Sequence, residues 1–225
     1  RQMCIRDRFL SATGLSKQYP DDDGLFQKAA AMSDEIANAY ESCDYREAMR
    51  FKRESEGDFD VAISVFGTGM ATVTRGSLRT DPNVTVQGVD ELYLPVSGLG
   101  IAKGRNFTPA EIDNGHAVVL LGQSVVDRVF ESWEDPVGQH VLVGAQRHTI
   151  AGVLEARGTT FGMSQDNQIL MPLLGVRRQY SDEGRSYNLT CTVERAEDLP
   201  EAIEAATGWM RMVRGDAPGC LLYTS

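Results

Sequence analysis

The residues best suited to chemistry in this sequence are few, and their spacing matches no metal site. The three histidines are His116, His140 and His148. None lies at metal-ligand spacing from a cysteine, and none belongs to a His-Glu-x-x-His motif. His140 and His148 flank a predicted β-hairpin, where histidine is ordinary at solvent-facing strand positions. We therefore expect both to be surface residues and predict no metal ligand.

Ser124, in the stretch LGQSVV, follows an apolar run and precedes a helical pattern, as a nucleophilic serine would. A nucleophile elbow needs glycine two positions later, whereas this chain has Val126. We interpret Ser124 as the N-cap of the helix that follows. The glycines between Gly98 and Gly104 have the wrong spacing for a dinucleotide loop, and the P-loop pattern is absent from the sequence. We predict no catalytic residue and no cofactor.

The composition is acidic, with 32 Asp and Glu against 22 Lys and Arg and a formal net charge of −10. Together with the absence of a Lys/Arg cluster in the sequence, this argues against nucleic acid and against an anionic membrane surface as the main partner. We interpret most carboxylates as solvated or helix-capping. A catalytic pair cannot be picked out without geometry, so a carboxylate-dependent enzyme stays an alternative. The most noticeable carboxylates are Asp21 to Asp23, Glu111, Asp113, Glu131, Glu134 and Asp135.

The elements that would position these residues change in character along the chain. From Asp21 to about Glu56 apolar residues recur every three or four positions, which predicts helix. Beyond Gly57, short β-branched runs separated by Gly, Pro and Asn predict a mostly antiparallel, β-rich region. The order indicates an α+β fold. Strands are expected at 59–67, 70–77, 83–90, 116–122, 140–144, 147–155, 168–173 and 187–194, and helices at 124–133 and 198–213.

The two tips of the chain differ from the protein between them. Codons for Cys220–Ser225 can be chosen so that their reverse complement encodes Met-Cys-Ile-Arg-Asp, the residues from Met3 to Asp7. That DNA resembles the transposon end used to fragment DNA for sequencing. We interpret residues 1–8 and 220–225 as adapter scars and expect them to pack against nothing.

Between the tips, two cysteines remain, Cys43 and Cys191. They either pair or are simply buried, and both alternatives are open at this point. No apolar run approaches the roughly 18 residues of a membrane span, and no signal peptide is visible.

The most specific pattern in the sequence is a set of residues typical of turns, helix starts and strand ends. The stretch LGIAKGRNFTPAE ends an element at Gly104 and starts a turn or helix at Thr108-Pro109. The stretch EDPVGQHVLVGAQRHTIAGVLE is a turn followed by a hairpin. We expect these boundary residues to have structural roles. They are Gly104, Arg105, Phe107, Gly122, Asp135, Pro136, Gly138, Gly152 and Pro172.

At these residues the chain resembles the MacB-like periplasmic core domain of ABC-transporter permeases, the group that includes MacB, LolC and FtsX. Five short motifs occur in the order of that family across Gly104 to Leu173. They are Gly104-Arg105-Asn106-Phe107, Val118-Val119-Leu120-Leu121-Gly122, Asp135-Pro136-Val137-Gly138, Gly152-Val153-Leu154 and Met171-Pro172-Leu173.

The resemblance implies two lobes: an incomplete α/β porter-like lobe from residues 9–57 and 187–219, and an inserted small β-rich lobe from residues 58–186. It implies a non-enzymatic domain on the periplasmic side of the bacterial inner membrane, anchored by membrane helices in the intact protein. The domain would transmit ATP-driven motion to a periplasmic substrate or partner, in efflux or export. A permease relative that releases lipoproteins or activates a cell-wall hydrolase is an alternative.

The partners that the resemblance implies are a cytoplasmic ABC ATPase, a second copy or a paired permease, and a periplasmic adaptor. It implies neither nucleic acid nor a cofactor.

Overall fold

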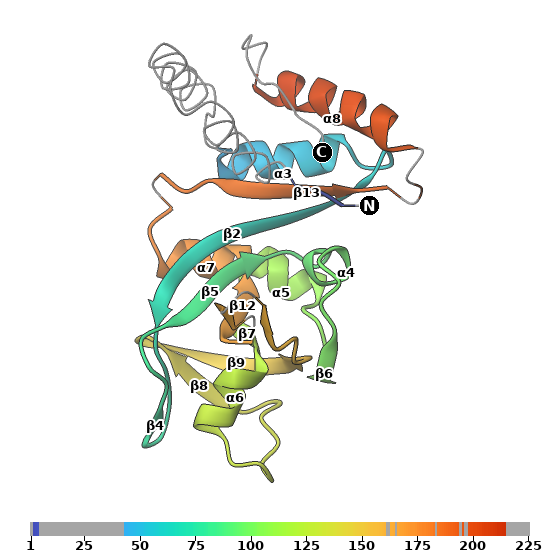
Figure 1. Ribbon diagram of the computed structural model, residues 1–225. Coiled ribbons are helices and arrows are strands. Elements are labelled where there is room, and N and C mark those ends of the chain that lie inside the picture. The colour runs from blue at the N-terminus through green and yellow to red at the C-terminus, as the bar shows by residue number, and fades with distance from the viewer. Residues whose placement is uncertain are drawn as a thin grey trace, which may run out of the picture. The chain divides into compact units, whose positions relative to one another are not determined.

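The computed structural model describes residues 2–4, 43–160, 163–164, 166–182, 184–193, 195 and 198–214. The chain forms two compact units, which are described separately (Figure 1). Unit 1 contains the described residues up to Val61 and those from Ser186 onward, and unit 2 spans Ala62–Arg185. Helices and strands occur in both units, which confirms the α+β fold. That the units are a porter-like lobe and an inserted lobe, with limits at 57/58 and 186/187, stays a prediction.

The described part of unit 1 contains helices α3 and α8 beside strand β13. Helix α3 (Tyr45–Glu54) begins at a capping box, in which Asp44 and Glu47 each accept the other's backbone N–H. Strand β13 (Tyr187–Thr192) contacts α3 through the rings of Tyr45 and Tyr187, whose centroids are 5.7 Å apart. Helix α8 (Leu199–Arg214) lies beside α3 (Figure 1). The part of the predicted first helix before Cys43 lies outside the described residues.

A short strand at the start of the chain, β1 (Gln2–Cys4), pairs antiparallel with β13, with Met3 opposite Cys191. The expectation that the tips pack against nothing is therefore wrong for these three residues. The physical reason is that a strand edge offers backbone N–H and C=O groups to any extended segment. Residues 5–8 and 220–225, with Ile5 and Leu222, lie outside the described residues, and the adapter interpretation stays a prediction.

Cys43 and Cys191 are both buried, and neither forms a disulfide. The carbonyl of Cys43 accepts the N–H of Tyr187 at 2.9 Å, and Cys191 comes four residues later along β13. Four strand residues span about 13 Å, whereas a disulfide needs Cα atoms within about 7 Å. The cysteines are therefore packing residues, and burial raises the pKa of the Cys191 thiol to about 12.

Unit 2 is built on a sheet with the strand order β2-β5-β12-β7-β9-β8-β3-β4, and β6 also pairs with β9. Most pairs are antiparallel as predicted, but β5–β12 and β7–β9 are parallel. A separate antiparallel pair joins β10 (Thr159–Thr160) and β11 (Met163–Ser164). The strands of the sheet are β2 (Asp60–Ala71), β3 (Val73–Arg75), β4 (Leu78–Arg79), β5 (Val84–Val89), β6 (Ile101–Gly104), β7 (Val118–Leu121), β8 (His140–Val143), β9 (Gln146–Leu154) and β12 (Gln168–Pro172).

Short helices connect these strands. The core holds apolar side chains from the strands and from the segments that contain α4 and α5. No helix among the described residues of the two units is long and apolar enough to cross a membrane. The helices are α4 (Tyr93–Val96), α5 (Pro109–Asn114), α6 (Gln123–Val129) and α7 (Leu173–Gln179). One core cluster contains Val89, Leu94, Phe107, Ile112, Leu120, Ala151, Leu154 and Leu170.

The last residue of unit 2 is tied to its first strand. The guanidinium of Arg185 donates to the carbonyls of Phe66 and Gly67 in β2, the second at 3.0 Å. It also donates to the carbonyl of Ser181. The two ends of unit 2 are therefore held together inside the unit itself.

Candidate functional site

Gly104 and Gly152 face each other where β6 pairs with β9. Gly104 has φ +81°, and a Cβ there would lie 2.3 Å from the carbonyl oxygen of Ala151. A Cβ on Gly152 would lie 2.8 Å from the carbonyl oxygen of Lys103. Two backbones approach here more closely than any side chain permits, so both positions require glycine.

Arg105 and Glu111 form a two-pronged ion pair directly after this crossing. The guanidinium donates to both carboxylate oxygens, at 2.7 and 2.8 Å. Glu111 also completes a capping box with Thr108 at the start of α5. Hydrogen bonds from Arg105, followed by those from Thr108, lower the pKa of Glu111 to about 2. Phe107, between the two partners, is buried in the core cluster.

Gly122 is the N-cap of α6, so the prediction that Ser124 caps this helix is wrong. A Cβ on Gly122 would lie 2.2 Å from the carbonyl oxygen of Asp166. The N–H of Gly122 also donates to the carbonyl of Gln168 at 2.8 Å. The close approach of these backbones requires glycine at the cap position and places Ser124 inside the helix.

The Asp135-Pro136-Val137-Gly138 motif is a turn that docks on β9. The carboxylate of Asp135 accepts the N–H of Val137 at 3.2 Å, as in an Asx turn. Gly138 has φ +79° and donates its N–H to the carbonyl of Ile150 at 2.8 Å. β9 therefore receives both this turn and the Gly104 crossing.

Pro172 ends β12 opposite Val89 of β5 and is the N-cap of α7. Its φ of −53° suits the step from strand to helix, and no side chain caps that helix. The nine boundary residues named in the sequence analysis therefore occupy strand crossings, turns and helix starts around one sheet. That these positions carry a shared structural function stays a proposal.

Sequence reasoning missed a second two-pronged ion pair, between Arg75 of β3 and Glu134 after α6. The guanidinium donates to Glu134 at 2.7 and 2.8 Å, to the side-chain oxygen of Gln139 at 2.8 Å and to the carbonyl of Val129 at 3.3 Å. It also lies 4.2 Å from the centre of the Phe130 ring. Hydrogen bonds from Arg75 lower the pKa of Glu134 to about 2. No local motif signals this pair, because its partners are 59 positions apart.

His148 is buried, which corrects the prediction of a solvent-facing position, whereas His140 is exposed. The Nε2 of His148 lies 3.1 Å from the side-chain oxygen of Gln179. The Nδ1 of His148 is buried without a hydrogen-bond partner in the described part of the chain. Gln179 in turn donates to the carbonyl of Val143 at 2.8 Å. Burial lowers the pKa of His148, so the imidazole is neutral. The hairpin pattern could not show this, because the residue that lies against His148 is Gln179 at the end of α7, 31 positions later.

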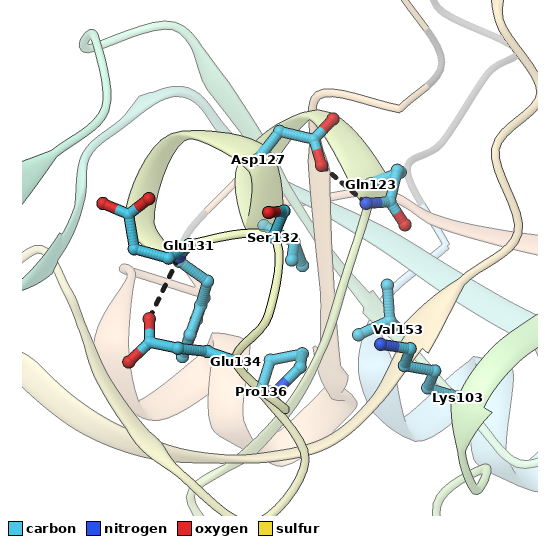
Figure 2. Close-up of a pocket in the computed structure, with 10 residues that line it drawn as sticks. Lys103, Gln123, Asp127, Glu131, Ser132, Glu134, Pro136 and Val153 are labelled. Atoms are coloured by element: carbon cyan, nitrogen blue, oxygen red, sulfur yellow. Dashed lines mark hydrogen bonds between the residues drawn. The ribbon is translucent and has the colours of Figure 1, made fainter.

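A pocket of about 300 Å³ lies between β6, α6 and the segment that follows α6 (Figure 2). Asp127 accepts from Gln123 at 2.6 Å, and Glu134 accepts the N–H of Glu131 at 3.0 Å. Lys103 lines the same pocket. Glu134 is held ionised, which is the opposite of what a proton donor needs. In residues 43–160 and the other described stretches, no group of three or more His, Cys, Asp or Glu could hold a metal ion.

The family model of the MacB-like periplasmic core domain matches residues 13–208. A macrolide export ATP-binding/permease protein MacB from Rhodospirillum rubrum is 32% identical over 136 residues, which cover 60% of this chain and 21% of that protein. MacB of Hyphomonas neptunium is 28% identical over 144 residues, covering 61% of this chain and 22% of that protein. The chain thus spans about a fifth of the length of these curated relatives.

Two solved structures share the fold. The extracellular domain of the noncanonic ABC-type transporter YknZ from Gram-positive bacteria superposes with a TM-score of 0.62 at 20% identity, over 79% of this chain and 87% of that one. The periplasmic region of MacB from Actinobacillus actinomycetemcomitans gives a TM-score of 0.61 at 19% identity, over 78% and 77% of the two chains.

Proposed function

Because this chain belongs to the family of MacB-like periplasmic core domains, we propose that it transmits ATP-driven motion of an ABC-transporter permease to a substrate or partner outside the inner membrane. Its place in the intact protein is the periplasmic side, between membrane helices. The partners are a cytoplasmic ABC ATPase, a second copy or a paired permease, and a periplasmic adaptor. The domain itself carries out no catalysis. Homologues named as macrolide export permeases favour efflux as the transported direction.

The observation that carries this proposal is the bracing of unit 2 by Arg75. One guanidinium joins β3, the end of α6 and the turn at Gln139 through four hydrogen bonds. A domain that passes on motion must move as a body with discrete arrangements, because a soft body absorbs the displacement. Bracing by several hydrogen bonds from one side chain serves that task, whereas the ionised Glu134 and Glu111 do not suit acid catalysis.

The test uses the full-length parent permease with its ATPase and a labelled macrolide as the first substrate. Arg75→Gln removes the brace, and Arg79→Gln, at an exposed position of β4, is the matched control. We expect Arg75→Gln to keep most ATP hydrolysis while export falls about fivefold or more, and Arg79→Gln to change neither. If export stays coupled to ATP hydrolysis although the Arg75→Gln domain has lost rigidity, mechanical transmission is contradicted.

The lipoprotein-release and hydrolase-activation alternatives are separated by what the intact permease captures. After crosslinking in the native host, the efflux proposal expects an adaptor to be recovered with the periplasmic domain. Recovery of lipoproteins or of a cell-wall hydrolase instead would move the proposal to the corresponding relative.

A further inference from the structure

The imidazole of His148 is a buried titratable group that plays no part in the proposed function. His148 lies in β9 opposite Val141 of β8, and only 3% of its surface is exposed. The side chain that contacts it comes from another element, because the side-chain oxygen of Gln179 lies 3.1 Å from Nε2. Gln179 is the last residue of α7. The buried histidine therefore joins the β8–β9 hairpin to the end of a helix.

The side chain of Gln179 determines which ring nitrogen of His148 carries the hydrogen. The amide nitrogen of Gln179 donates to the carbonyl of Val143 at 2.8 Å, so the amide oxygen is the atom directed at the imidazole. An amide oxygen can only accept, and Nε2 of His148 is therefore the donor. In the neutral ring Nδ1 is then a lone pair, and it is buried with no hydrogen-bond partner among the described residues.

A proton added to Nδ1 would leave a buried donor without an acceptor. The imidazolium of His148 has two N–H groups, whereas the site offers it one acceptor, the oxygen of Gln179. Burial disfavours the charged ring as well and lowers the pKa of His148 below its ordinary value of 6.5, although the hydrogen bond to Gln179 opposes this shift. The proton therefore binds more readily to an imidazole that has left the site.

The charged groups on and beside α7 do not compensate for such a proton. Arg177 contacts Asp182 at 2.8 Å, so that carboxylate is directed to the arginine. The guanidinium of Arg178 donates to the carbonyl of Gly115 at 3.0 Å. The helix thus brings a second positive charge to its last turn, which would not stabilise a charged His148.

Tyr180 and the hairpin bring no negative charge to the imidazole either. Burial raises the pKa of Tyr180, so its hydroxyl is neutral, and Arg185 lies 5.9 Å from the centre of the Tyr180 ring. His140 and Arg147 of the hairpin are exposed. In the part of the chain that the structure describes, no carboxylate contributes to the pKa shift of His148.

The end of α7 is the part of the unit that such a proton would release. Leu173 and Val176 fix the start and middle of the helix, because both side chains are buried. Gln179 is only half-buried and attaches the last turn to the hairpin through its two hydrogen bonds. The chain then leads to Arg185, the last residue of unit 2. The last turn therefore opens at a lower cost than the rest of the helix.

We propose that the contact between His148 and Gln179 is acid-sensitive: it holds the last turn of α7 on the β8–β9 hairpin at neutral pH and releases it in acid. A group that binds protons more readily in the open form favours opening as the pH falls below 6.5. This range lies above pH 4.5, below which Glu111 and Glu134 begin to bind protons in the unfolded chain. The two responses are therefore separate, and the inference does not depend on the proposed function.

The experiment is hydrogen exchange of the backbone amides of this chain at about pH 7.5 and about pH 5.5, corrected for the intrinsic exchange rate at each pH. The reporters are the amides of the last turn of α7, with that of Tyr180, which donates to the carbonyl of Val176 at 2.8 Å. The reference is the amide of Gly122, which donates to the carbonyl of Gln168 at 2.8 Å.

We expect the reporters to open about tenfold more at the lower pH, because an open histidine about one pH unit below its ordinary pKa is mostly protonated. They should also open more readily than the Gly122 amide at both pH values, since the end of the helix opens without unfolding of the sheet.

Three variants separate this contact from other effects of acid. His148→Phe keeps a buried ring that binds no proton, so its acid response should shrink to within about twofold. His140→Gln removes an exposed histidine of the same hairpin and should keep the full response. Gln179→Glu should reverse the response, because the imidazolium then gains a carboxylate partner. This last variant keeps the test decisive if His148→Phe does not fold.

Three results would overturn the proposal: no increase in opening of the reporters in acid, a full acid response in His148→Phe, or equal opening of the reporters and the Gly122 amide. The third result would mean that the whole of unit 2 unfolds in acid and that the end of α7 does not open by itself.

Discussion

Unit 2 contains two arginine–glutamate pairs that have the same hydrogen-bond lengths but differ in how far apart the partners lie in the sequence. Arg105 and Glu111 are six positions apart and hold the entry to one short helix. Arg75 and Glu134 are 59 positions apart and join a strand to the segment after a helix. The Arg105 side chain is 55% exposed, whereas that of Arg75 is 24% exposed.

The first pair lies in a stretch that shapes the backbone locally, whereas the second joins segments that are far apart in the sequence. The Arg105 region can be recognised along the chain, because glycine, capping residue and proline occur within a few positions. The Arg75 region has no such signal, yet its guanidinium makes more contacts. We therefore expect the backbone to decide stability in the first region and the side chain to decide it in the second.

The largest expected effect is that of Gly104→Ala. The new Cβ would meet the Ala151 carbonyl at 2.3 Å with φ at +81°, so the free energy of unfolding should fall by about 3 kcal/mol. Gly138→Ala is the control, because φ there is +79° but nothing lies within 4 Å, and it should cost about 1 kcal/mol. Urea unfolding of the two variants measures both, and equal losses would show that close approach contributes nothing.

The next effect comes from removing each guanidinium. Arg75→Met should lower the free energy of unfolding more than Arg105→Met does, because four acceptor atoms on separate segments lose their donor. Arg105→Met should cost about 1 kcal/mol or less, as is usual for a half-exposed ion pair. Double-mutant cycles with Glu134→Gln and Glu111→Gln would give the two coupling energies, and a larger coupling for Arg105 would reverse the comparison.

Acid should weaken both regions. The pKa values of Glu111 and Glu134 are about 2 in the folded chain against an ordinary value of 4.5. Below pH 4.5 the unfolded chain therefore binds protons that the folded chain does not, so stability falls progressively between pH 4.5 and about 2. Glu111→Gln should flatten this fall, and Glu111→Gln/Glu134→Gln should flatten it further. Urea midpoints measured across this pH range test the prediction, and an unchanged slope in the double variant would contradict it.

The smallest effect is expected for Asp135→Ala, which removes one exposed turn hydrogen bond to Val137. Stability should fall by about 1 kcal/mol, as for a lost cap, with the fold retained. Thermal melting of the chain measures the change. Were Asp135 a catalytic carboxylate instead, the intact protein would lose its activity while the melting temperature stayed the same.

Much of the secondary structure could be predicted from the sequence, because β-branched runs and helical spacing are local properties. Strands β5, β7, β9 and β12 lie within or close to the expected ranges, and α8 begins and ends within a residue or two of the expected range. Helix α6 stops at Val129 rather than at Trp133, because Phe130 is extended and buried beneath the Arg75 guanidinium.

Other elements could not be predicted, since their cause is tertiary. Helix α7 follows β12 without a break, and Gly175 inside it weakens the helical signal. β6 is four residues with mostly exposed side chains, and it is a strand because Gly104 and Gly152 let two backbones meet. The burial of His148 likewise depends on a segment far along the chain, since Gln179 lies against it.

The tie between Arg185 and the carbonyls of Phe66 and Gly67 has a consequence for how such a unit can be exchanged. The two ends of this stretch of more than a hundred residues lie close together, so joining them costs the rest of the chain little loop-closure entropy. A replacement for this stretch would meet the same two ends, whatever its length or sequence.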